Sequence, residues 1–111
     1  MVQSFAVWCP KCLRQSKEMG KLTDVALVSL DTDPNEDTAI VKKHAQKNNF
    51  NWQFVVSPKT VTKALIDEFG FRVVNAPSEP VILVCKDQST RFLKSGLKTA
   101  EELKEQIKKG C

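Results

Sequence analysis

Short runs of apolar residues recur along the chain, and their lengths predict buried strands. The nearly continuous apolar run at residues 25–30 closes with Asp31-Thr32-Asp33-Pro34. This pattern is typical of a parallel strand that is buried on both faces and ends in a polar loop. The predicted strands are residues 2–8, 25–30, 52–56, 80–85 and 90–93. The polar residues 86–89 predict a turn that joins the last two strands into an antiparallel hairpin.

Apolar residues at helical spacing fill most of the segments between these strands. Pro10 suits the first turn of a helix that ends at Gly20, because a missing N–H is harmless there. A surface helix is expected over residues 36–48, and a third helix ends at Gly70. The spacing of Thr99 and Glu102 is that of a capping box, which predicts a last helix ending near Gly110.

This order of elements predicts the fold class. Strands alternate with helices at first, and a hairpin followed by a helix closes the chain. We therefore expect an α/β fold whose central mixed sheet has parallel strands plus a C-terminal antiparallel hairpin, with helices on both faces. A length of 111 residues fits a single domain, 1–111, with one core of its own.

Composition and charge narrow the classes of partner. An apolar share of 41% and a charged share of 27% are those of a soluble globular protein. The net charge is +4, but 17 basic residues are scattered among 13 acidic ones, so no nucleic acid partner is expected. The longest apolar runs are far too short for a membrane span, so no membrane partner is expected either.

The start of the chain bears on localisation. Met1 is followed within a few residues by a predicted strand, which leaves no room for a secretory signal peptide. The chain as written is therefore expected to be cytoplasmic. A start at a core strand is equally typical of an excised domain, in which case the protein would be extracytoplasmic.

The sequence Trp8-Cys9-Pro10-Lys11-Cys12 carries the strongest chemical signal. A cysteine at a helix start has its thiolate stabilised by unpaired N–H groups and the helix dipole, so Cys9 is a candidate nucleophile. Cys12 lies about one helical turn further on, within reach of a mixed disulfide on Cys9. A structural disulfide, half of a zinc site and inert thiols are the alternatives. The surrounding strand and helix pattern and the preceding Trp8 favour redox chemistry.

The remaining candidate residues have simpler interpretations. A zinc site would need two more ligands, and Cys85, Cys111 and His44 lack the paired spacing of such a site, so no metal and no cofactor are expected. Cys85 is interpreted as a small core residue, and His44 as a packing or exposed residue. Cys111 is interpreted as an incidental exposed thiol, with an intermolecular disulfide or an electron relay as alternatives. Asp31, Asp33 and Asp37 lack the pattern of a calcium loop, which favours turn and helix-cap roles.

The strand, the Trp-Cys-x-x-Cys sequence at residues 8–12 and the following helix together resemble the thioredoxin superfamily. Residues 28–34 and the helix after them are similar to its TlpA/ResA and Sco-like branch. The resemblance implies a thioredoxin-like fold and a thiol-disulfide oxidoreductase that exchanges disulfides with protein substrates, acting as a reductant. Cys9 would attack and Cys12 would resolve the mixed disulfide. Partners would be proteins with disulfides or dithiols and a separate reductase or redox partner, and the protein would act as a monomer.

The resemblance also assigns residues around the thiols. Trp8 would shield the thiolate and offer an apolar surface to partners, while Pro10 and Lys11 would tune the pair. The family has a cis-proline before the strand that enters its hairpin; Pro80 is the favoured candidate and Pro77 the alternative.

The chain departs from the family pattern at three points. Gln3 stands where many thioredoxins carry a buried acid, so proton transfer to Cys12 would use water, Lys11 or another group. Lys11 inside the motif should lower the pKa of the thiolate beside it. The family's first strand and helix have no counterpart here.

Two other activities known on similar folds fit the residues less well. Sco-like proteins bind copper through two cysteines and a distant histidine, but here the thiols have CxxC spacing and no histidine lies near residues 81–84. Thiol peroxidases need Thr or Ser three residues before the cysteine and an earlier Pro, where this chain has Ala6 and Val2. A redox-inert binding module is the last alternative, and the presence of both thiols counts against it.

Overall fold

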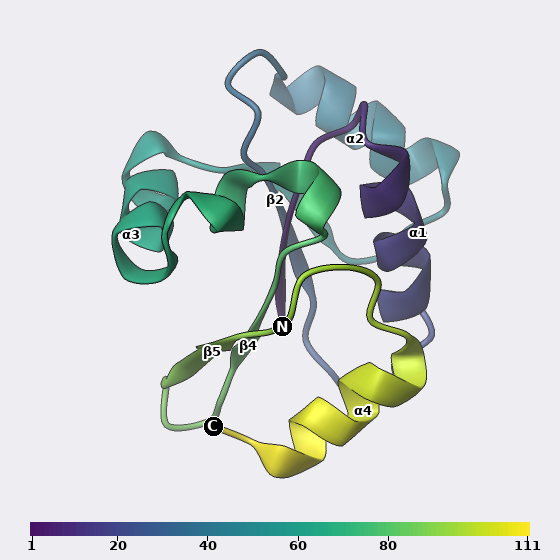
Figure 1. The fold of residues 1–111 in the computed structure, drawn as a ribbon. Coiled ribbons are helices and arrows are strands. Elements are labelled where there is room, and N and C mark those ends of the chain that lie inside the picture. Colours follow the sequence, from purple (N-terminus) through teal and green to yellow (C-terminus); the bar gives the residue numbers. More distant parts are fainter.

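Five strands pair into one mixed sheet with the order β3-β2-β1-β4-β5 in the computed structural model, which describes all of residues 1–111 (Figure 1). The strands are β1 Val2–Phe5, β2 Val28–Asp31, β3 Gln53–Val56, β4 Val81–Val84 and β5 Thr90–Phe92. β1, β2 and β3 are mutually parallel, whereas β4 runs antiparallel to both β1 and β5. The predicted α/β class and mixed sheet, with its C-terminal hairpin, are confirmed.

Four α-helices and two short 3-10 helices connect the strands. They are α1 Pro10–Met19, α2 Thr38–Lys47, α3 Lys59–Phe69, η1 Phe71–Val74, η2 Ala76–Ser78 and α4 Ala100–Lys109. The predicted capping role of Thr99 is confirmed, because its hydroxyl accepts the Glu102 N–H at 3.2 Å. Gly70 ends α3 with φ of 84°, which favours glycine there. Each α-helix is too short and too polar to cross a lipid bilayer.

The second strand begins later than the apolar run predicts. β2 starts at Val28 rather than Val25, because Asp24 adopts a left-handed conformation with φ of 60° and redirects the chain. Val25 and Leu27 pack against a core cluster without joining the sheet. The run of apolar residues therefore records burial, and only its last part forms ladder hydrogen bonds.

Helices cover both faces of the sheet (Figure 1). One core cluster joins β4 and the residue after β5 to α1 and α4: Met1, Met19, Leu22, Val81, Leu83, Leu93, Ala100 and Leu103. Side chains alternate between the faces of a strand, so Ile82 points away from this cluster. Its cross-strand partner Phe92 meets Phe69 of α3, with ring centroids 5.4 Å apart. α3 therefore covers the face opposite to α1 and α4.

A second core cluster surrounds the start of α1 and holds both thiols of the CxxC sequence. Its members are Phe5, Ala6, Cys9, Cys12, Val41 and Ala76. Phe5 anchors the cluster to an aromatic group on α2 and β3, stacking on His44 with 5.6 Å between ring centroids and meeting Phe54 edge-on. The end of β1 and the first turn of α1 are thereby fixed against neighbouring elements.

Candidate functional site

Cys9 is the N-cap residue of α1, as its predicted position at the mouth of a helix requires. Its Sγ accepts a hydrogen bond from the backbone N–H of Cys12 at 3.1 Å. Pro10 occupies the first helical position, where it leaves no N–H unpaired. A thiolate at this atom would be stabilised by that N–H and by the positive end of the helix dipole.

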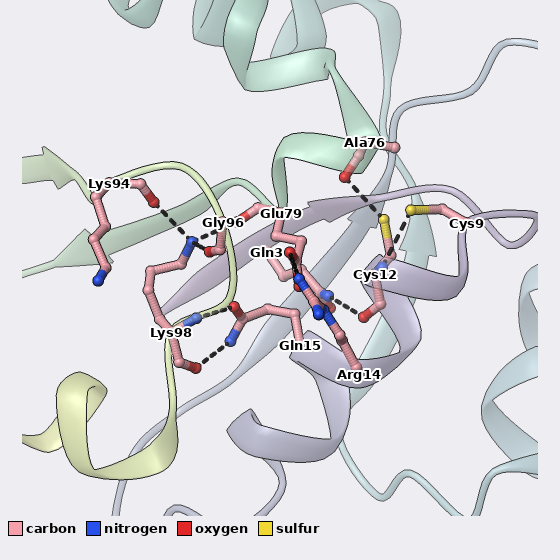
Figure 2. A network of polar contacts seen from close by, with 10 residues as sticks. All are labelled: Gln3, Cys9, Cys12, Arg14, Gln15, Ala76, Glu79, Lys94, Gly96 and Lys98. Carbon is pink, nitrogen blue, oxygen red and sulfur yellow. Dashed lines mark hydrogen bonds and ion pairs between the residues drawn. The ribbon is translucent and has the colours of Figure 1, made fainter.

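Cys12 lies beneath Cys9 and is 1% exposed. Its thiol donates a hydrogen bond to the carbonyl of Ala76 in η2 at 3.2 Å (Figure 2). Burial, followed by its hydrogen bond to Cys9, raises the pKa of the Cys12 thiol far above its usual range. Both cysteines are free thiols and Cys9 itself is only 2% exposed, so the pair is a buried dithiol.

Gln3 lies beside the first turns of α1 and is fully buried. Its amide Nε2 donates to the carbonyl of Cys12 at 3.1 Å, while Oε1 accepts the hydroxyls of Ser16 at 2.9 Å and Ser29 at 2.7 Å. The side chain therefore links β1, α1 and β2. An amide neither gains nor loses a proton near neutral pH, so Gln3 fixes the position of α1 and does not act as an acid or base.

Glu79 is a buried carboxylate close to the thiols that the sequence did not single out. It is 1% exposed and pairs with Arg14 of α1 through two hydrogen bonds of 3.0 and 2.7 Å (Figure 2). This bidentate pair ties α1 to the segment that enters β4. The negative charge of Glu79 adds to the causes that raise the pKa of Cys12.

Lys98 is also buried, at 1% exposure, in the loop before α4. Its ammonium donates to the backbone carbonyls of Glu79, Lys94 and Gly96 (Figure 2). Gln15 of α1 makes two hydrogen bonds of 2.9 Å with the backbone of Lys98. Burial lowers the pKa of Lys98 to about 8. Lys98 thus joins the loop before α4 to the segment that carries Glu79.

The loop after β2 holds the residues that precede Cys9. The indole N–H of Trp8 donates to Asp33 Oδ2 at 2.7 Å, and the backbone N–H of Val7 donates to Glu36 Oε1 at 2.8 Å. Trp8 is nevertheless 57% exposed, so it presents an apolar surface beside the buried thiols. The contacts of Asp33 and Glu36 were missed because the two segments are distant in sequence.

Asp31 lies beneath this loop and is 1% exposed. Its Oδ1 accepts the N–H of Asp33 at 2.9 Å, while no protein group donates a hydrogen bond to Oδ2. Burial, followed by the neighbouring Glu36 carboxylate, raises the pKa of Asp31 to about 8. The predicted turn role of Asp31 and Asp33 and the cap role of Asp37 are confirmed, the latter by Asp37 Oδ1 accepting the Ile40 N–H at 2.9 Å.

The expected cis-proline is absent, because every peptide bond in the chain is trans. Pro77 lies within η2, whose trans, helical backbone directs the Ala76 carbonyl at Cys12. Pro80 is buried and follows Glu79, whose left-handed φ of 57° reverses the chain instead. The segment with both prolines does lie against the thiols, as predicted, although neither bond is cis. Lys11 is exposed.

Cys85 and Cys111 form a disulfide, with Cα atoms 6.1 Å apart, so both interpretations of these residues were wrong. Cys85 is half-buried at the end of β4, and α4 returns the end of the chain to the same place. Because β4 is antiparallel to β1, this disulfide lies at the end of the sheet opposite to Cys9 (Figure 1). The two cysteines are 26 residues apart in sequence, and only the tertiary fold brings them together.

We expect the Cys85→Ser/Cys111→Ser variant to lose about 2–3 kcal/mol of unfolding free energy, because the cross-link restricts the unfolded chain. This loss of unfolding free energy should be at the low end of that expected for a loop of this length, since Cys111 is the exposed last residue. Urea titration followed by circular dichroism measures the change. Equal midpoints for the variant and the oxidised wild type would contradict a stabilising cross-link.

His44 packs within the aromatic group on α2 and β3, which confirms its interpretation as a packing residue. Burial lowers the pKa of its imidazole. No three His, Cys, Asp or Glu side chains converge anywhere in the structure in an arrangement that could hold a metal ion.

Comparison of the chain with protein-family models, with curated proteins and with solved structures finds no match.

Proposed function

We propose that the protein is a thiol-disulfide oxidoreductase of the thioredoxin superfamily, resembling its TlpA/ResA-like branch and acting as a reductant of protein disulfides. One observation carries the proposal: Cys9 caps a helix N-terminus while Cys12, one turn later, is buried and protonated beside it. A helix-start thiol is suited to attack, and a buried thiol of raised pKa is suited to wait until a mixed disulfide has formed.

The reaction consists of two exchange steps. The Cys9 thiolate attacks one sulfur of the substrate disulfide, so that a Cys9–substrate bond forms and the substrate S–S bond breaks. The released sulfur leaves as a thiolate and takes up a proton. Cys12 then loses its proton and attacks Cys9 Sγ, which forms the Cys9–Cys12 disulfide and releases the second substrate thiol. Two electrons and two protons pass to the substrate, and a separate reductase restores the dithiol.

The burial of Cys9 adds a requirement to the first step. At 2% exposure, its sulfur has to be uncovered before a protein disulfide can reach it. We assign this movement to Val7 and Trp8, because their polar groups are held by two side chains of the loop after β2, Asp33 and Glu36. Exposed Trp8 is the first surface that a docking protein would meet.

The proposal is tested by turnover of a disulfide-bonded protein with dithiothreitol as the recycling reductant. We expect the wild type to accelerate reduction and the Cys9→Ser variant to leave it at the background rate. The Cys85→Ser/Cys111→Ser variant is the matched control, since it removes the other thiols and should retain turnover. A wild type no faster than Cys9→Ser would overturn the proposal.

The direction of exchange is tested by equilibration with glutathione buffers, followed by alkylation and mass measurement of the Cys9–Cys12 pair. A potential near about −270 mV supports a reductant. A potential near about −120 mV would instead contradict the reducing direction.

A further inference from the structure

A cavity of about 620 Å³ opens at the carboxyl ends of β2 and β3, beside the loop that holds Trp8. Open α/β sheets bind ligands at this edge of their parallel strands. One wall is polar, with Asp31, Asp33 and Glu36; the other is apolar, with Ile66, Phe71 and Val74. None of these residues exchanges sulfur or protons with the substrate in the reaction proposed above.

The polar wall contains an unsatisfied buried group. Asp31 is 1% exposed, and its Oδ2 receives no hydrogen bond from any protein donor. A buried carboxyl oxygen without a donor is unfavourable, and a ligand that donates hydrogen bonds would relieve it. The Glu36 carboxylate beside it also accepts the Val7 N–H, and a cation entering the cavity would allow both carboxyl groups to be charged.

The charge of the cavity contrasts with that of the chain. The protein has a net charge of +4, yet the cavity is lined by four acidic residues and two lysines. Lys63 is already paired with Asp67 at 2.8 Å. Asp33 and Glu36, and Asp31 once it is ionised, are therefore opposed by Lys59 alone. Because they do not converge as metal ligands do, the complementary cation is an extended organic group.

The cavity is coupled to the dithiol through two hydrogen bonds. Asp33 accepts the Trp8 indole N–H and Glu36 accepts the Val7 N–H, and Cys9 is the next residue along the chain. A group bound against these carboxylates therefore lies next to the segment that immediately precedes Cys9. Phe71, 76% exposed on the rim, offers an aromatic face to an alkyl or guanidinium group.

We propose that this cavity docks a basic side chain, arginine or lysine, that lies close to a half-cystine in the protein substrate of Cys9. The proposal rests on the thiol-disulfide exchange function and names its substrate class. A guanidinium supplies several donors in one plane for Asp31 and Glu36, and its alkyl stem fits the apolar wall of Ile66 and Val74. Docking brings the neighbouring disulfide to Trp8 and Cys9.

The test compares peptide disulfides that differ only in one residue, arginine or glutamine, placed roughly two to four residues from the half-cystine. For the wild type we expect kcat/KM to be about tenfold higher for the best arginine peptide, mainly through KM. In the Asp31→Asn variant this arginine-to-glutamine ratio should fall to about one. Equal kcat/KM for both peptides in the wild type, or a ratio that survives in Asp31→Asn, would overturn the proposal.

Two further variants control for local damage. Lys59→Glu adds a negative charge at an exposed position on the rim of the cavity, so we expect the ratio to rise above that of the wild type. Glu105→Gln removes an exposed acid on α4, outside this cavity, and should leave the ratio unchanged. A general defect in folding or catalysis cannot raise the ratio in one variant and abolish it in the other. A ratio unmoved by Lys59→Glu would count against the site.

Calorimetry with serine in place of the half-cystine separates this site from the redox function. Tighter binding of the arginine analogue than of the glutamine analogue, without reduction of either disulfide peptide, would support the site and overturn the exchange function. Reduction of both peptides at equal kcat/KM would support the exchange function and overturn the docking site. Free arginine can be added as a competitor in the reduction of the arginine peptide. If it inhibits that reduction when its concentration equals that of the peptide, the cavity binds a small molecule, which would overturn a docking role for polypeptides.

Discussion

A Cys12→Ser variant is expected to stop after the first exchange and to accumulate as a covalent complex between Cys9 and its substrate. Serine keeps a hydroxyl that can donate to the Ala76 carbonyl as the Cys12 thiol does, so the fold around α1 should be unchanged. It cannot attack a mixed disulfide, so multiple turnover should fall by roughly 10³-fold or more. Non-reducing electrophoresis and intact mass would detect the complex.

The matched controls separate attack from resolution. The Cys9→Ser variant should form no complex, and neither should the Cys9→Ser/Cys12→Ser double variant. Complexes that persist without Cys9 but vanish in Cys85→Ser/Cys111→Ser would move the reactive thiol to the other end of the sheet. That outcome would contradict the assignment of Cys9 as the nucleophile.

An Asp31→Asn variant should be more stable than the wild type at pH 8, the second large effect that we expect. The pKa of Asp31 rises from 3.8 to about 8 on folding, so between these values the folded chain holds a proton that the unfolded chain has released. The contribution of Asp31 to the free energy of unfolding is therefore complete below about pH 4. It falls as the pH rises above 4 and is lost once the pH has risen through 8. The full difference is of order 5 kcal/mol. Asparagine does not titrate, so the variant does not lose this contribution as the pH rises.

Urea titrations of both proteins from pH 4 to pH 9 measure this effect as the difference between two stability curves. The Asp24→Asn variant is the control, because Asp24 is exposed and asparagine tolerates its left-handed φ of 60°. Its curve should run parallel to that of the wild type. A pH-independent difference between Asp31→Asn and the wild type would show that Asp31 is ionised in the folded protein at neutral pH.

The sequence predicted the elements well where local chemistry and burial agree. Thr99 and Asp37 cap helices as expected, and Gly70 ends one. The second strand was misplaced because hydrophobicity reports burial and not hydrogen bonding. Val25 and Leu27 are packed against the core while Asp24 keeps them out of the sheet.

The candidate site was predicted in its chemistry and missed in its surroundings. The thiol pair lies where the motif indicated, because an N-cap and a helical turn are set by neighbours in sequence. The contacts of Glu79 with Arg14 and of Asp33 with Trp8 depend on residues 65 and 25 positions apart. No periodicity encodes such pairs. The same holds for Cys85 and Cys111, which only the return of α4 to the end of β4 brings together.

The two sulfur pairs of this chain are in opposite oxidation states, with Cys85 bonded to Cys111 while Cys9 and Cys12 are free. At equilibrium such a state persists only in surroundings whose reduction potential lies between the potentials of the two couples. A stronger reductant would open the cross-link, and a stronger oxidant would close the dithiol. The molecule therefore has two limiting reduction potentials, one for each couple. Only between them does it hold a reactive dithiol in a cross-linked fold.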